Sequence, residues 1–174
     1  MPSITKTYSL VGAFLLAFIA ILATTVRSPS ISDTFEATQV ALIQPIVALV
    51  AITAVVWCLM VAYRNVAFSR GLVSERYFQT FTSDAPREWI ERPARAYMNL
   101  LELPILFYAV CSFMLATGHF DRTQVALAWL FVASRGVHAF IYIAFNYVPL
   151  RFAAFAAGAI TLGVLWTRFA LGFV

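Results

Sequence analysis

Charged residues are scarce in this sequence, and their scarcity excludes several classes of protein at once. Of the 174 residues, only 11% are Asp, Glu, Lys or Arg, whereas 62% are hydrophobic. A soluble domain has about 25% charged and 45–50% apolar residues, so the chain is not a soluble globular protein. Its 16 phenylalanines also exclude a disordered chain. The composition therefore predicts a protein whose solvent is lipid.

Cysteine and histidine are equally rare, with two of each. Cys58 and Cys111 lie in apolar stretches without a CxxC motif or Cys/His spacing, so neither a disulfide framework nor a metal site is indicated. Both cysteines are expected to pack in the core. The GxSxG, HExxH, P-loop and Rossmann glycine patterns are also missing. The net charge of +4 comes from scattered basic residues that form no patch, which disfavours a nucleic-acid partner.

Long apolar runs are what the sequence has instead. A helix needs roughly 20 apolar residues to cross a bilayer. Five segments are long enough: Tyr8 to Val26, Val40 to Tyr63, Tyr97 to Thr117, Thr123 to Phe145 and Pro149 to Val174. The connections after the third and fourth segments are short, which predicts antiparallel neighbours in an up-down bundle. We therefore expect an all-α integral membrane protein: an extra N-terminal transmembrane helix and linker in residues 1–39, and a four-helix transmembrane domain in residues 40–174.

The polar stretch from Arg64 to Arg95 predicts the orientation of this bundle. It carries six arginines against four acidic residues, and the positive-inside rule places it in the cytoplasm. Lys6, before the first segment, then lies on the same side, and the turn at Asp121 lies outside. A secretory signal peptide is the alternative for the first segment, but no small-residue cleavage site follows it.

The third segment carries a stripe of polar residues. An ionisable side chain at the bilayer centre costs about 2.5–3.5 kcal/mol on insertion scales, so each one needs a reason. Arg95, Asn99 and Glu102 are spaced i, i+4, i+7 and share one helical face within about 60°. Glu102 lies about 10 Å deeper in the membrane than Arg95. The stripe is expected to descend from the cytoplasmic surface.

The fourth segment repeats this arrangement with Arg135, His138 and Tyr142, spaced i, i+3, i+7. This stripe runs toward the cytoplasmic end, where Arg151 opens the fifth segment. Both stripes are therefore expected to converge with Arg151 on one pocket that faces the cytoplasm. Its guanidinium, carboxylate, amide, imidazole and phenol groups match a zwitterionic ligand with several carboxylates.

The same residues also permit a purely structural interpretation. Arg95 or Arg135 would then pair with Glu102, and the other polar side chains of the two stripes would hydrogen-bond across helices and lock the bundle. The spacing of the residues does not separate this interpretation from a ligand site.

Two motifs resemble the MAPEG family, the membrane-associated proteins in eicosanoid and glutathione metabolism. The run ERPARAYMNLLE at residues 91–102 resembles the signature ER-x-x-RA-x-x-N-x-x-E of the family's second helix. The spacing Arg135-x2-His138-x3-Tyr142-x8-Arg151, ending in VPLR, is similar to the third and fourth helices of the family's prostaglandin E synthases. The resemblance covers the four-helix domain and suggests a bacterial-type member, in the inner membrane.

This resemblance implies a homotrimer of four-helix subunits, with glutathione bound between neighbouring subunits near the cytoplasmic face. It implies that Arg151 is catalytic and activates the glutathione thiol, since a guanidinium stabilises the nucleophilic thiolate. The expected activity is that of a thiol transferase, peroxidase or isomerase acting on lipophilic electrophiles from the bilayer. The residues that the resemblance assigns to glutathione binding are Arg95, Asn99, Glu102, Arg135, His138 and Tyr142.

Some positions depart from the family's pattern. Leu103-Pro104 stands where some members have a tyrosine, Met98 replaces a basic residue, and the ligand-binding arginine of the first family helix is displaced to Arg64 or lost. These departures, together with the unmatched helix at residues 8–26, leave a second function open. The chain would then be a non-catalytic subunit that docks to other membrane proteins through that helix. A small lipid- or ion-handling protein is a third alternative.

Overall fold

The computed structural model describes residues 4–27, 39–80 and 87–173, and most of them are helical. The helices are α1 (Ile4–Arg27), α2 (Gln39–Ser69), α3 (Glu75–Thr80), α4 (Glu88–Thr117), α5 (Arg122–Ala144) and α6 (Val148–Leu171). No strand occurs within the described ranges. The helices α2, α4, α5 and α6 are each long and apolar enough to cross a membrane. The predicted all-α membrane bundle is confirmed.

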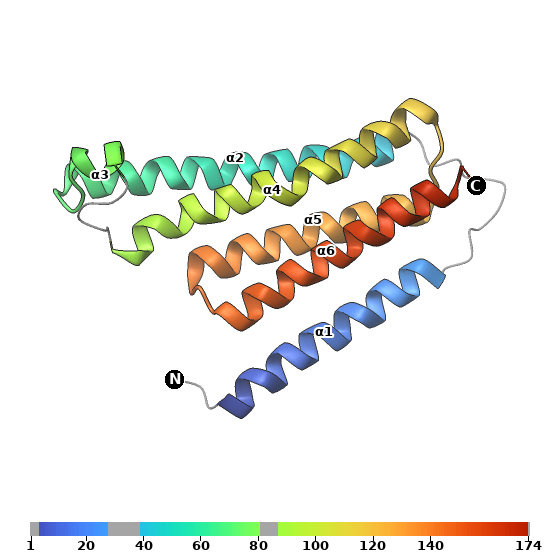
Figure 1. The fold of residues 1–174 in the computed structure, drawn as a ribbon, viewed down its shortest axis with the longest axis horizontal. Helices are drawn as coiled ribbons and strands as arrows, with labels where there is room; N and C mark the ends of the chain where they lie inside the picture. Colours follow the sequence, from blue (N-terminus) through green and yellow to red (C-terminus); the bar gives the residue numbers. More distant parts are fainter. Residues whose placement is uncertain (1–3, 28–38, 81–86, 174) are drawn as a thin grey trace.

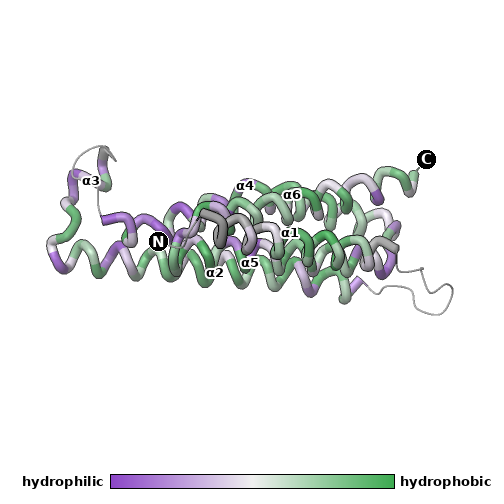
Figure 2. The backbone as a smooth tube through the Cα atoms, turned by 90° about the horizontal axis from the view of Figure 1, so that it is seen from below, coloured by the Kyte–Doolittle hydropathy of each residue, from purple (hydrophilic) through white to green (hydrophobic). Residues whose placement is uncertain are grey.

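The long helices lie alongside one another in two pairs. Figure 1 shows α2 beside α4 and α5 beside α6, and α2 and α4 each also contact α5. α1 lies along α6 on the outside of the bundle. In Figure 2 the tube is mainly hydrophobic along the bundle and more hydrophilic toward the end that carries α3. We call this end the α3 end.

α1 is the predicted N-terminal addition to the four-helix domain. Its apolar stretch runs over Gly12–Thr24. Phe18 is only 7% exposed, and Leu22 packs against the main core of the bundle. Leu16 and Ile19 are exposed, so one side of the helix packs on the bundle and the other faces outward. That α1 itself crosses the membrane stays a prediction.

The polar stretch between the second and third predicted segments is largely helical, which corrects the predicted boundaries. α2 continues past Tyr63 to Ser69, and α4 begins at Glu88, well before Tyr97. Hydropathy marks where an apolar run ends, but a helix continues into water because its hydrogen bonds are internal. The end of α2 and the start of α4 therefore extend the bundle at the α3 end.

The short helix α3 packs on this extension through a small core of its own. Tyr77 of α3 is 7% exposed and clusters with Ala67 of α2 and Ile90 of α4. An ion pair with 3.7 Å between Arg64 Nη2 and Glu91 Oε2 joins α2 to α4 beside this core. Burial, followed by the effect of the Glu91 carboxylate, raises the pKa of the Tyr77 phenol above its ordinary value. The α3 end is thus a packed cap on the bundle.

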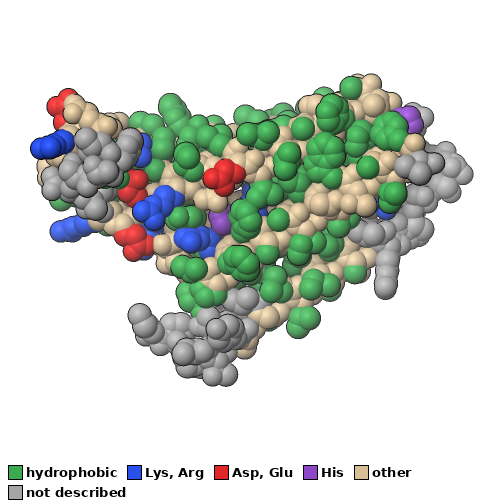
Figure 3. All heavy atoms as spheres, viewed as in Figure 1, with side chains coloured by type: hydrophobic (Ala, Val, Ile, Leu, Met, Phe, Trp, Pro, Cys, Tyr) green, Lys and Arg blue, Asp and Glu red, His purple; other side chains and the backbone are tan. Residues whose placement is uncertain are grey.

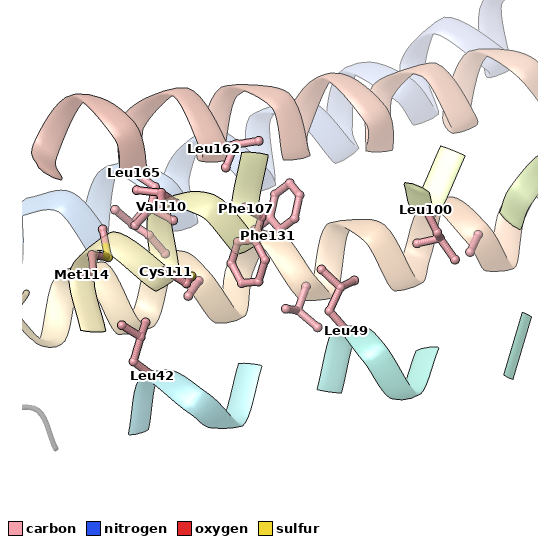
Figure 4. Packing of buried hydrophobic residues seen from close by; sticks show 14 of the residues in the cluster. Leu42, Leu49, Leu100, Phe107, Val110, Cys111, Met114, Phe131, Leu162 and Leu165 are labelled. Atoms are coloured by element: carbon pink, nitrogen blue, oxygen red, sulfur yellow. The ribbon is translucent and has the colours of Figure 1, made fainter. Parts of the chain in front are cut away.

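The main core lies deeper in the bundle, between the long helices. Phe107 of α4 and Phe131 of α5 stack with their ring centroids 4.8 Å apart, and Cys111 is fully buried in the same cluster (Figure 4). Cys58 of α2 is exposed instead, so the expectation that both cysteines pack in the core is wrong for Cys58. α2 buries only 11% of its apolar window within the chain, and Cys58 lies on its outward side.

The start of α5 is fixed by Asp121 at the end of the bundle opposite α3. Its carboxylate accepts a hydrogen bond from the Gln124 backbone N–H at 2.9 Å, and the Gln124 side chain accepts one from the Asp121 N–H at 2.8 Å. This reciprocal arrangement is a capping box. The second oxygen of Asp121 lies 2.9 Å from Arg168 Nη2. Asp121 thereby ties the first turn of α5 to the last turn of α6.

Asp121→Ala should lower the free energy of unfolding by about 1–2 kcal/mol, because it removes both the cap and the ion pair. Asp121→Asn is the matched control, since asparagine is an equally good N-cap but carries no charge. It should cost less than about 1 kcal/mol. Thermal unfolding in detergent measures both effects. Equal losses for the two variants would show that the cap does not stabilise the protein.

Candidate functional site

Arg135 lies in the middle of α5, on the face that packs against α6. It is only 1% exposed, and its Nη2 donates to the backbone carbonyls of Ala154 at 3.1 Å and Phe155 at 3.0 Å. The rings of Phe131 and Phe155 flank the guanidinium, with centroids 5.6 and 5.1 Å from Cζ. Nε and Nη1 of Arg135 are buried and have no hydrogen-bond partner among the described residues. Arg135 is therefore bonded to α6 through Nη2 and still has two donor groups, Nε and Nη1, that could bind a ligand.

Gly158 of α6 makes room for this guanidinium. A Cβ at Gly158 would overlap Arg135 Nη2 and would lie 2.9 Å from Arg135 Cζ and 2.5 Å from Ser134 Oγ. The adjacent turns of α6 are also built from small buried residues, Ala154 and Ala157. The close approach of α5 and α6 at this level thus depends on a residue without a side chain.

His138, Tyr142 and Arg151 lie together nearer the α3 end. Nδ1 of His138 donates to the backbone carbonyl of Arg151 at 3.0 Å, since a carbonyl only accepts. Nε2 of His138 is buried and has no hydrogen-bond partner in the part of the chain that the structure describes. The guanidinium of Arg151 lies over the ring of Tyr142, with 4.1 Å between Cζ and the ring centroid. The predicted α5 face and the first turn of α6 therefore meet at one place.

Asn146, in the turn between α5 and α6, holds the other side of Arg151. Its Oδ1 accepts a hydrogen bond from Arg151 Nη1, and its Nδ2 donates to Glu88 Oε1 of α4 at 2.6 Å. Asn146 does not cap the last helix: the residue that caps α6 is Tyr147, and no described side chain bonds to that helix end. The asparagine instead links α4, the turn and α6 through its side chain.

The predicted stripe on α4 points away from its own chain. Arg95 and Glu102 are exposed, and Asn99 Nδ2 donates to the Arg95 carbonyl of the same helix at 2.9 Å. Within the described residues, Glu102 forms no ion pair with Arg95 or Arg135, so the pairing of the structural interpretation does not occur. On the face drawn in Figure 3, charged side chains gather toward the α3 end and hydrophobic ones cover most of the rest. The two stripes share an end of the bundle, but no hydrogen bond or ion pair joins them in the part of the chain described.

Comparison with known families identifies the class of protein. The sequence model of the MAPEG family matches residues 42–171. The chain belongs to the MAPEG family. The match runs from the first turns of α2 to the end of α6 and does not include α1. No curated protein and no solved structure matches the chain.

The positions at which this MAPEG chain departs from the family's pattern lie around the α4 stripe. Met98, in place of a basic residue, is 59% exposed next to Asn99. Pro104 is buried within α4. Arg64, one of the two alternatives considered for the arginine of the first family helix, pairs with Glu91 of its own chain. Arg95 is thus the one basic residue of the predicted α4 stripe, and the α5–α6 cluster brings the predicted His138, Tyr142 and Arg151 together.

Three residues of this region are not among those predicted from sequence: Glu88, Asn146 and Gly158. For two of them, Gly158 and Asn146, the sequence contains a pattern that could have indicated their role. A glycine inside an alanine-rich helix often marks a close helix contact, and an asparagine just after a helix often adopts the left-handed conformation. Nothing in the sequence distinguishes Glu88 from the other acidic residues before the third segment.

Proposed function

We propose that this MAPEG protein binds glutathione at the α3 end of the bundle and catalyses the attack of its thiol sulfur on lipophilic electrophiles. The observation that carries the proposal is the convergence of Arg151, Tyr142 and His138 beside the buried Arg135. A glutathione molecule brings two carboxylates, an amine and a thiol, and arginine is the side chain that best binds carboxylates. The unpaired buried donors of Arg135 and the basic groups of Arg151 and Arg95 fit such a ligand.

The chemistry follows from a cation placed next to a thiol. The guanidinium of Arg151 stabilises the thiolate, which is the nucleophile, and the thiol proton passes to water. The thiolate sulfur then forms a bond to the electrophilic carbon, and the bonding electron pair of the broken bond leaves with the displaced group. In a peroxide the same attack is on oxygen: an S–O bond forms, the O–O bond breaks, and the alkoxide leaves and takes a proton from water. A second glutathione then attacks the sulfur of the sulfenic acid, which gives the disulfide and releases water.

We further propose that a homotrimer completes this site. The α4 stripe places Arg95, Asn99 and Glu102 on a membrane-spanning helix, where contact with lipid costs about 2.5–3.5 kcal/mol for a charge near the bilayer centre. Covering the stripe with a second copy of the chain removes that cost. Glutathione would then lie between subunits, with the exposed α4 residues on its outer side.

The positive-inside rule supports a cytoplasmic α3 end. The stretch from Arg64 to Arg95 carries six arginines and four acidic residues. In a bacterial inner membrane this orientation gives the site access to cytoplasmic glutathione. The electrophile would reach it from the bilayer.

The protein purified in detergent should bind glutathione and develop the ultraviolet absorbance of a thiolate at neutral pH. S-methylglutathione is the control, because it has the same carboxylates and amine but no ionisable thiol, and it should compete for binding without the absorbance. Crosslinking in the same detergent should give a trimer. A protein that binds neither ligand, and purifies with another membrane protein instead, would refute the proposal in favour of the non-catalytic subunit. In that role α1 would be the docking helix.

A further inference from the structure

Asn146 occupies a backbone conformation that few residues adopt. Its φ is 48°, and within the described ranges it is the sole residue other than glycine with a positive φ. Asparagine is among the side chains that best tolerate this left-handed region. Its backbone N–H donates to the Ile141 carbonyl at 2.8 Å, which fixes the residue at the end of α5. The turn therefore holds the Asn146 side chain in one direction.

The Asn146 amide can form its two hydrogen bonds in only one orientation. A carboxylate only accepts and a guanidinium only donates, so Nδ2 must face Glu88 and Oδ1 must face Arg151. Glu88 is itself held by Arg92, whose Nε and Nη2 lie 3.3 Å from the same Oε1. The start of α4 thus determines which atom of Asn146 is presented to Arg151.

Arg151 is restrained at three points by this arrangement. Its backbone carbonyl accepts from His138, its guanidinium lies over the Tyr142 ring, and its Nη1 donates to Asn146. Arginine has several rotatable bonds and loses up to about 2 kcal/mol of side-chain entropy when it is ordered. The stack on Tyr142 fixes the distance of the guanidinium from the Tyr142 ring. The bond to Asn146 limits how far the guanidinium rotates above that ring.

We infer that Asn146 is a positioning residue: held by Glu88, it fixes the direction of the Arg151 guanidinium toward the bound thiol. The inference rests on the proposed function for its role in the reaction, but the restraint on Arg151 exists without ligand. Asn146 and Glu88 touch neither the thiol nor the electrophile in this scheme. Their effect reaches the reaction only through Arg151.

Asn146→Gly is the variant that isolates the amide, because glycine adopts the positive φ without strain and removes only the side chain. Asn65→Ala is the control, since Asn65 is an exposed amide on α2. Glu88→Gln serves as a second variant. Its glutamine keeps an oxygen that accepts from Asn146, but it adds a donor and removes the charge. In both measurements below, the Glu88→Gln protein should therefore give a value between that of the wild type and that of Asn146→Gly.

The first measurement needs no glutathione. Phenylglyoxal modifies accessible guanidinium groups, and peptide mass spectrometry gives the rate at Arg151 relative to the exposed Arg70 of the same molecule. That ratio should rise roughly tenfold in Asn146→Gly, because the loss of one charge-assisted hydrogen bond changes an equilibrium by about this factor. It should stay unchanged in Asn65→Ala. An unchanged ratio in Asn146→Gly would overturn the inference.

The second measurement follows the thiolate absorbance of bound glutathione against pH. In Asn146→Gly the pH profile of the thiolate absorbance should move to higher pH. The kcat should fall by a larger factor than the factor by which the KM for glutathione changes. If the wild type forms a thiolate and the variant has the same profile, Asn146 does not position Arg151 for the reaction. If the wild type forms no thiolate although the phenylglyoxal ratio rises in the variant, the proposed function fails while the restraint on Arg151 stands.

Discussion

Gly158→Ala should lower the free energy of unfolding by about 3 kcal/mol, a large effect for one added methyl group. The new Cβ would lie 2.9 Å from Arg135 Cζ and 2.5 Å from Ser134 Oγ. The guanidinium cannot move away without giving up its bonds to the carbonyls of Ala154 and Phe155. A buried charge would then be left with fewer hydrogen bonds, at a cost that adds to the steric strain.

Gly163→Ala is the control for this prediction, because Gly163 lies on the same helix and a Cβ added there would have no neighbouring atom within 4 Å. It should leave stability unchanged or raise it by up to about 1 kcal/mol, through the higher helix propensity of alanine. Unfolding in a denaturing detergent series gives both values.

A changed background tests the cause of the Gly158 effect. In a protein that carries Ser134→Ala and Arg135→Leu, the atoms that the new methyl group meets are gone or replaced. Gly158→Ala should then cost less than about 1 kcal/mol. If the cost stays the same in this background, the close approach to Arg135 is not what requires glycine at position 158.

The order of the long helices and four of the five expected membrane spans could be predicted from the sequence, because lipid imposes one strong rule. Every backbone polar group in the bilayer must be satisfied within its own helix, so a long apolar run has few alternatives. The ends of the helices do not obey this rule. Past Tyr63 and before Tyr97 the sequence is polar, so hydropathy carries no information about helix continuation, and both α2 and α4 extend there.

The part of the site that depends on the spacing of residues along one helix could be predicted from the sequence. Arg135, His138 and Tyr142 lie on one face of α5, as their i, i+3, i+7 spacing requires, and Arg151 meets them because the turn after α5 is short. The partners of Arg151 depend instead on contacts between distant segments. Glu88 and Asn146 are 58 positions apart and touch through a single hydrogen bond, which no local pattern encodes.

Arg151→Ala should reduce kcat with glutathione about 100-fold, while the Kd for glutathione changes far less. A neighbouring cation shifts the ionisation of an acid by about 1–3 pH units, so its loss removes most of the thiolate at neutral pH. In the proposed site, Arg95 and Arg135 would still be present to bind the carboxylates of the tripeptide. Stopped-flow measurement of the thiolate and steady-state turnover of one model electrophile separate these two effects, and Arg70→Ala, an exposed arginine at the same end of the bundle, serves as the control.

Arg151→Lys distinguishes charge from geometry at this position. Lysine keeps the positive charge but lacks the planar fork that lies over Tyr142 and bonds to Asn146. If charge alone stabilised the thiolate, the lysine variant would match the wild type. We expect a kcat between those of the wild type and Arg151→Ala, because the ammonium has no fixed direction above the Tyr142 ring. An Arg151→Ala protein with full turnover would exclude Arg151 as the activating group. The unpaired donors of Arg135 and the unpaired acceptor Nε2 of His138 would then be the next groups on the α5 face to examine.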